Sequence, residues 1–275
     1  PLLALLAHLH LGRLEPQRAL ELSEQLLSLA QVSGNALYLA AGHDLLGMSL
    51  FMQGNLRQAR AHLEQGLASY PWETDRSTAV VVGAMGTDLH TDLHLWLSYC
   101  LWLLGYPDQA NEHGLEMLRL AERLDHPFTL AMALVMHCLI TVFTRSEIGD
   151  VLAYSEHLLR LADEKELLFV RPWGIIFRSW AQAVTGQGAA AIPQLSAGLQ
   201  ALRQTGTLLS SPVMRALLAK AYLLLGRAEK GLAVVDTALG EGEQQGAVHN
   251  KAELLRLRGE LLLARTLMSM LRARA

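Results

Sequence analysis

A glycine that ends an apolar helical run recurs along the chain, and a small residue follows it five positions later. In the segment 101–110, the apolar run ends at Gly105 and the small residue is Ala110. The same pattern occurs three more times, as Gly54 with Ala59, Gly186 with Ala191 and Gly226 with Gly231. A glycine just past a helix end takes the left-handed conformation at little cost, and a small residue early in the next helix lets the two helices pack closely. The pattern therefore predicts helical hairpins.

These hairpins follow one another at a near-constant spacing. We place their turns at Gly12, Gly54, Gly105, Arg145, Gly186 and Gly226. Successive turns are 40 to 42 residues apart, except for one interval of 51 residues that contains a loop insertion at 70–86. One hairpin cannot bury its apolar face alone, so neighbouring hairpins must stack. We expect an all-α, right-handed α-solenoid of about six hairpins, which forms a single array over residues 1–275.

Composition and charge exclude several classes of function. The chain is 51% hydrophobic and 18% charged, which is enough apolar material for a large core. The net charge of −3 offers no basic field for nucleic acid, and no apolar run is long enough to cross a membrane. Neither Cys100 nor Cys138 has a CxxC partner, which favours reduced thiols and a cytoplasmic location. We find no phosphate-binding loop and no nucleophile elbow, and we expect no cofactor and no enzyme activity.

The hairpins resemble tetratricopeptide repeats when each turn glycine is set at position 15 of that repeat. The repeat then expects a small residue at position 8, a large one at 11 and a small one at 20. The Gly54 unit supplies Gly47, Leu50 and Ala59, and the Gly105 unit supplies Ser98, Leu101 and Ala110. The Gly226 unit supplies Ala219, Tyr222 and Gly231, whereas the Gly186 unit departs with Ala183 at the large position.

A narrower resemblance covers residues 36–265. The phrases LWLLGYPDQA, AERLDHPFTLA, WGIIFRSWA and AELLRLRGELLL are similar to the tetratricopeptide-like C-terminal region of bacterial signalling ATPases, in which a STAND-type NTPase is fused to a class III nucleotide cyclase or a LuxR-type regulator. The chain does not begin with Met, and we expect it to be a piece of such a longer protein. The resemblance implies a non-enzymatic regulatory arm that binds a protein or peptide partner, or a small-molecule effector.

The resemblance also implies where such a partner binds, since the first helix of each tetratricopeptide hairpin lines the concave surface. Counted from the turns, the candidate groove residues are Asp44, Met48, Phe51, Asp92, Tyr99, Trp102, Met132, Trp173, Trp180 and Lys220. Exposed aromatic side chains there are suited to stacking on a peptide or a flat ligand. The alternative is that a tightly wound superhelix buries this face, so that the same residues form core.

Two further alternatives remain open. His90 and His94 lie four residues apart on one helix face, which suits a metal clamp with Asp92 nearby, and a metal-dependent enzyme would use them. The competing interpretation is an ordinary polar helix start, with Asp88 favoured at the N-terminus, and we expect no metal site. The last alternative is a structural scaffold, in which the apolar ends of the array pair to form a homodimer.

Overall fold

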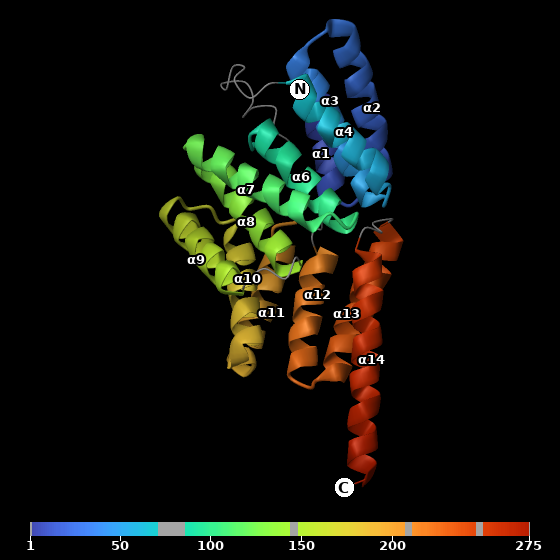
Figure 1. Cartoon of the computed structure of the whole chain (residues 1–275), viewed down its shortest axis with the longest axis vertical. Helices are drawn as coiled ribbons and strands as arrows, with labels where there is room; N and C mark the ends of the chain where they lie inside the picture. Colours follow the sequence, from blue (N-terminus) through green and yellow to red (C-terminus); the bar gives the residue numbers. More distant parts are fainter. Residues whose placement is uncertain (1, 71–85, 144–147, 207–210, 246–249, 275) are drawn as a thin grey trace.

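The computed structural model describes residues 2–70, 86–143, 148–206, 211–245 and 250–274, and these residues form helices without any strand. The helices pair as successive antiparallel hairpins (Figure 1). The hairpins are α1 (Leu2–Gly12) with α2 (Pro16–Ser33), α3 (Ala36–Met52) with α4 (Leu56–Ser69), α6 (Leu89–Leu103) with α7 (Pro107–Arg123), α8 (Pro127–Phe143) with α9 (Ile148–Glu164), α10 (Arg171–Gln182) with α11 (Gly188–Gln204), and α12 (Ser211–Leu224) with α13 (Ala228–Gln245). A long helix, α14 (Lys251–Arg274), follows. The predicted all-α helical repeat is confirmed.

The turn glycines take the conformation that the pattern predicts. Gly54, Gly105, Gly186 and Gly226 have φ angles of 81°, 88°, 99° and 66°. Of these, Gly186 lies within a short π-helical segment, Ala183–Gln187, that joins α10 to α11. The small residues five positions later are buried in the hairpin seams. A Cβ added at Gly231, for example, would lie 3.2 Å from the Ala219 carbonyl oxygen on α12 and 2.5 Å from Leu261 Cδ2 on the following helix α14.

Two parts of the chain differ from the expected repeat boundaries. Helix α1 continues through Gly12, and the left-handed residue of the first turn is Leu14, with φ of 59°. At the other end, the last hairpin is followed by α14, one continuous helix of 24 residues that has no following partner helix in the described part of the chain. Arg145, the turn position that we placed without a glycine, lies outside the described residues, as do positions 71–85 of the expected insertion.

The array curves so that its last helices return to its first half. The Tyr99 hydroxyl of α6 donates a hydrogen bond to Asn250 Oδ1, just before α14, at 2.9 Å. Gln244 at the end of α13 lies beside the turn between α1 and α2, including Arg13 and Gln17. The second half of α14 projects beyond the other helices (Figure 1). The inner side of the array is therefore closed by the chain itself near α6.

The buried apolar residues fall into two clusters. The larger one runs without a break from Ala4 on α1 to Ala221 on α12. The smaller one joins α12, α13 and the first half of α14, around Val235 and Leu257. Because α12 contributes to both clusters, it connects the last hairpin to the rest of the array. The seam between α11 and α12 lies beside this connection, and the candidate site is found there.

Candidate protein-interaction site

The structure places most of the sequence-predicted groove residues in the interior. Eight of the ten are no more than 9% exposed, namely Asp44, Met48, Phe51, Asp92, Tyr99, Met132, Trp173 and Trp180, while Trp102 and Lys220 are half-buried. The ring centroids of Phe51 and Tyr99 lie 4.9 Å apart, and those of Tyr99 and Trp102 lie 5.8 Å apart. These side chains lie on the first helices of their hairpins, as expected, and pack against one another. Their role as a partner groove stays a prediction.

A second group of predicted residues lies further along this inner side. The Lys220 ammonium of α12 lies 5.6 Å from the ring centroid of Trp180 on α10, within reach of a cation–π interaction. The indole N–H groups of Trp173 and Trp180 are buried and have no acceptor among the described residues. The structure therefore brings Trp180 and Lys220 together.

Asp44 is an unusual member of the predicted set because both its carboxyl oxygens are buried without a hydrogen-bond partner among the described residues. Burial raises the pKa of Asp44 well above its ordinary range, and the nearby charge of Asp92 raises it further. Asp92 instead accepts a hydrogen bond from the Thr87 hydroxyl at 2.6 Å. Asp44 thus folds most favourably as the neutral acid, which suits a core position better than a charged contact with a ligand.

The predicted metal candidates do not pair with each other. His94 Nδ1 lies 2.8 Å from His113 Nδ1 on α7, whereas the His90 ring lies against Tyr70, with centroids 5.6 Å apart. Over the described parts of the chain, no three His, Cys, Asp or Glu side chains are grouped closely enough to hold a metal ion. The spacing of four residues therefore does not bring His90 and His94 together as the alternative of a metal clamp would require.

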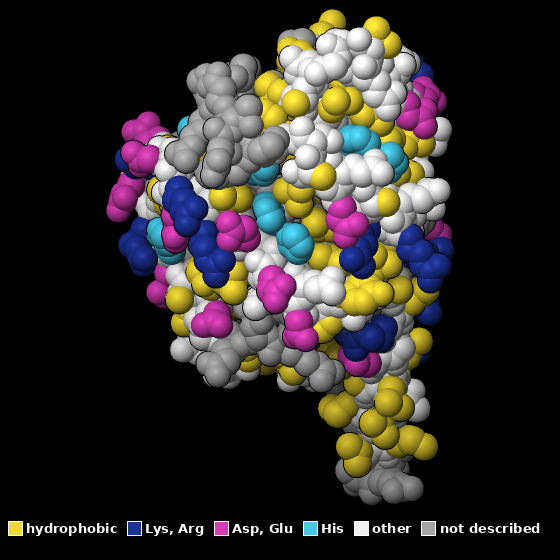
Figure 2. All heavy atoms as spheres, turned by 45° about the horizontal axis from the view of Figure 1, so that its top comes forward, with side chains coloured by type: hydrophobic (Ala, Val, Ile, Leu, Met, Phe, Trp, Pro, Cys, Tyr) yellow, Lys and Arg dark blue, Asp and Glu magenta, His cyan; other side chains and the backbone are white. Residues whose placement is uncertain are grey.

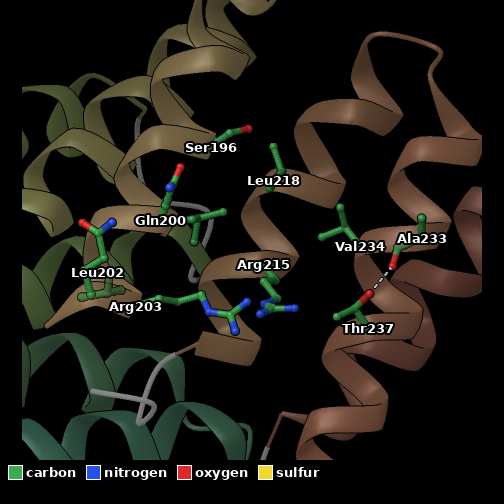
Figure 3. A pocket seen from close by; sticks show the side chains of 11 residues that line it. Ser196, Gln200, Leu202, Arg203, Arg215, Leu218, Ala233, Val234 and Thr237 are labelled. Atoms are coloured by element: carbon green, nitrogen blue, oxygen red, sulfur yellow. Dashed lines mark hydrogen bonds between the residues drawn. The ribbon is translucent and has the colours of Figure 1, made fainter. Parts of the chain in front are cut away.

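A cavity of about 680 Å³ opens between the hairpin α10/α11 and the hairpin α12/α13 (Figure 3). Its walls come from three helices. The lining residues that matter here are Leu199, Arg203, Arg215, Leu218, Ala233 and Val234. Leu218 and Val234 present methyl groups to the cavity, and the small side chain of Ala233 leaves room beside them (Figure 3). This volume lies within the range of cavities that enclose a ligand or the anchoring side chains of a partner.

Two arginines bring positive charge to one end of this cavity. Arg203 from α11 and Arg215 from α12 direct their guanidinium groups toward each other (Figure 3). Arg215 is largely buried and is paired with Glu241 of α13, at 2.9 Å. Arg203 is exposed, and it forms no ion pair with any part of the chain that the structure describes. One guanidinium is thus available to bind a carboxylate in bidentate fashion, beside an apolar wall.

Sequence reasoning missed this site. Arg203 and Arg215 are twelve residues apart on different helices, and Arg203 lies on a second helix of a hairpin, not on the expected first helices. The turn pattern specifies how α10 packs on α11 and how α12 packs on α13. It carries no information about the seam between the two hairpins, so nothing in the repeat register could locate the cavity.

The geometry defines a helical repeat scaffold, and comparisons with known proteins show what parts of it are similar to. Residues 40–65 and 212–237, which lie in the hairpins α3/α4 and α12/α13, match the model of the tetratricopeptide repeat. An uncharacterized protein of Rhizobium meliloti (strain 1021) is 25% identical over 211 residues, which are 77% of this chain and 20% of that protein. The chain thus spans about a fifth of the length of this relative. The crystal structure of a thermophilic tetratricopeptide-repeat protein from Thermus thermophilus covers 81% of this chain and 99% of its own, with 20% identity and a TM-score of 0.47.

Two further properties of the described residues concern membrane crossing and the chemistry of the cysteines. None of them combines the length and the apolar character that crossing a membrane requires. Cys100 and Cys138 are buried free thiols, and burial raises the pKa of the Cys100 thiol to about 12. Both cysteines therefore behave as unreactive core residues. A cytoplasmic location stays a prediction.

Proposed function

We propose that this chain is a non-enzymatic protein-binding module, and that an acidic and apolar segment of a partner protein docks in the cavity between α11, α12 and α13. The observation that carries the proposal is the Arg203 guanidinium, which faces an apolar cavity without an ion pair among the described residues. An arginine beside a concave apolar wall can bind a carboxylate while a neighbouring leucine or phenylalanine fills the cavity. The tetratricopeptide-like repeats support the same class of function.

The charge balance at the cavity favours an acidic partner. Arg203 and Arg215 bring two positive charges to the cavity, and the carboxylate of Glu241 neutralises the charge of Arg215. A partner carboxylate that pairs with Arg203 need not break the bond between Arg215 and Glu241. A basic segment would meet an uncompensated guanidinium instead, which costs electrostatic energy.

The test uses fluorescently labelled peptides in which Glu alternates with Leu or Phe, together with matched peptides that carry Gln for Glu. Fluorescence anisotropy should show binding of the Glu peptides and at least about tenfold weaker binding of the Gln peptides, since charge-assisted contacts contribute roughly 1.5–3 kcal/mol. Arg203→Glu should remove the preference. Arg57→Glu, which reverses an exposed arginine on α4, is the matched control and should bind as the unaltered chain does. Binding that is equal for the Glu and Gln peptides, or unchanged in Arg203→Glu, contradicts the proposal.

We further propose that the module acts as the regulatory arm of a larger signalling protein, such as an ATPase or a transcriptional regulator. The resemblance of segments in 36–265 to such arms supports this, as does a relative about five times as long as the matched region. Occupancy of the cavity would then shift an equilibrium in the attached domain, because a ligand biases any state that it binds more tightly. Substituting Arg203→Glu in the full-length protein should change its regulation while its basal activity persists. We also propose that the half-buried Trp102 and Lys220, from the predicted inner groove, contact a partner or a small-molecule effector.

A structural oligomerisation scaffold is the alternative, and α14 supports it. The second half of this helix exposes apolar side chains, with Leu263 at 62%, Leu267 at 52% and Met270 at 56%. A second copy could cover this face. Light scattering after gel filtration tests the idea, with Leu267→Glu as the variant and Arg265→Glu on the same helix as the control. A dimer that only Leu267→Glu converts to monomer favours the scaffold, and a monomer at all concentrations excludes it.

A further inference from the structure

A hydrogen bond joins α6 to the residue just before α14. The Tyr99 hydroxyl donates it to Asn250 Oδ1 at 2.9 Å, although the two residues are 151 positions apart in the chain. Both side chains are buried, at 3% and 6% exposed. The described parts of α6 and α14 do not otherwise pack along each other's length. This hydrogen bond, the Tyr99–Asn250 latch, therefore fixes the start of α14 to the first half of the array.

The two partners of the latch are held to different degrees. The Tyr99 ring packs against Phe51 and Trp102, with ring centroids 4.9 Å and 5.8 Å away, so the core sets the position of its hydroxyl. Asn250 Nδ2, by contrast, is buried without an acceptor among the described residues. A buried unpaired donor costs free energy that is regained when the group reaches water. The latch is therefore a contact that opens at a reduced cost.

Asn250 also supports one wall of the binding cavity. On α13, Thr237 lines the cavity, whereas the next residue, Ala238, lies with Leu239 beside Asn250. The space left at the contact with Asn250 is about 10 Å³, no more than a water molecule needs. The same stretch of α13 thus faces the proposed partner on one side and Asn250 on another.

Helices α13 and α14 form one unit. The lack of a side chain at Gly231 lets Leu261 of α14 approach α13, because an added Cβ there would lie 2.5 Å from Leu261 Cδ2. Val235 and Leu257 belong to the buried cluster that the two helices share. The second half of α14 projects from the rest of the molecule with apolar side chains on its surface, so its first half sets its position (Figure 2). A displacement of the start of α14 therefore displaces α13 as well.

The cavity of about 680 Å³ lies between α11 and the α13/α14 unit, so its width depends on the position of this unit. We propose that the Tyr99–Asn250 latch regulates the cavity: a closed latch holds α13 at the distance from α11 at which the partner segment fits, and an open latch releases it. The inference rests on the proposed function of the cavity. A segment that binds only when the latch is closed also stabilises the closed latch, since coupling between two sites is reciprocal. Binding is thereby transmitted to the start of α14.

Hydrogen exchange of the whole chain without peptide tests the latch itself. The Leu254 amide donates a hydrogen bond to the Asn250 carbonyl at 3.1 Å, so the amides of 254–257 report on the start of α14. Tyr99→Phe keeps the ring and removes the hydroxyl, and it should lower their protection by about fivefold, the effect of one neutral hydrogen bond. Tyr154→Phe, which removes the hydroxyl of a half-buried tyrosine on α9, is the matched control and should leave their protection unchanged.

Hydrogen exchange with peptide tests the coupling to the cavity. The peptides that alternate Glu with Leu, added at ten times their dissociation constant, should raise the protection of 254–257 by about tenfold in the unaltered chain. The reason is that a ligand that binds one state alone stabilises that state in proportion to its concentration over the dissociation constant. In Arg203→Glu, the same peptide concentration should leave the protection of 254–257 as it is without peptide.

Asn250→Ala is a second variant, so that one misfolded protein does not decide the result, and circular dichroism establishes that each variant is folded. Combined with Tyr99→Phe, it should lower the protection no further than the single substitutions do. Unchanged protection in both Tyr99→Phe and Asn250→Ala would overturn the inference, as would a peptide that binds by anisotropy without raising the protection of 254–257. Both of these results leave the proposed function standing. Absence of binding by every Glu peptide overturns the proposed function and this inference together.

Discussion

The hairpins α3/α4 and α12/α13 match the same repeat model, yet they pack against their neighbours differently. Both have a left-handed glycine at the turn, Gly54 and Gly226, and a small residue five positions later. In α3/α4, the side chain of Phe51 is fully buried and packs against Trp96 and Tyr99. In α12/α13, Leu218 and Val234 face a cavity. The same repeat pattern is thus compatible with a tightly packed seam between hairpins, as around Phe51, and with a seam that opens into a cavity, as beside Leu218.

The largest expected difference between the two hairpins concerns truncation of a core side chain. Phe51→Ala should lower the free energy of unfolding by about 3–5 kcal/mol, because it removes a ring that is in contact on all sides. Leu218→Ala should cost less, about 2–3 kcal/mol, the low end of the range for a buried leucine, since Leu218 is only 8% exposed but borders the cavity. Urea denaturation of both variants measures these values. Equal losses would show that the cavity wall is packed as tightly as the core around Phe51.

Acid should next separate the hairpin α12/α13 from the helices α6 and α8, which follow α3/α4 and carry buried histidines. His94 and His137 have their pKa lowered by burial to about 4, whereas an unfolded histidine titrates near 6.5. Their contribution to stability is complete above pH 6.5 and is lost as the pH falls toward 4, at a cost on the order of 3 kcal/mol per histidine. Residues 211–245 contain no histidine.

Hydrogen exchange, corrected for intrinsic rates, should therefore show loss of protection in α6 and α8 between pH 7 and pH 5, with α12 and α13 unaffected. If α12 and α13 lose protection first, the histidines are not what makes the array acid-sensitive.

The smallest expected effect concerns the turns, where the two hairpins should behave alike. Gly54→Ala and Gly226→Ala both force a side chain into the left-handed region, at φ of 81° and 66°, and each should cost roughly 1–2 kcal/mol. No heavy atom lies within 4 Å of a Cβ added at Gly226, so the strain of the backbone is the whole effect there. The losses of unfolding free energy that thermal melts give for the two variants should agree within about 0.5 kcal/mol. Substitutions that differ in no other structural feature usually agree within this range. A much larger loss at one turn would show that the two turns differ in more than the glycine.

The sequence predicted the architecture because its signal is local. A glycine such as Gly105 and a small residue such as Ala110 act within one hairpin, and the structure confirms both. The predicted position of the first turn, Gly12, was wrong by two residues, because Leu14 takes the left-handed conformation without being a glycine. The site could not be predicted in the same way. Arg203 and Arg215 meet across a seam between hairpins, and their meeting depends on how those hairpins stack.

The measurement that tests the central claim most directly is peptide binding by a chain whose cavity is filled. Ala233→Trp places a large side chain at an exposed position of the cavity wall and leaves Arg203 and Arg215 in place. The account predicts that this variant keeps the melting temperature of the unaltered chain and no longer binds the peptides that alternate Glu with Leu or Phe. A folded Ala233→Trp chain that binds these peptides with unchanged affinity would contradict the assignment of the cavity between α11, α12 and α13 as the partner site.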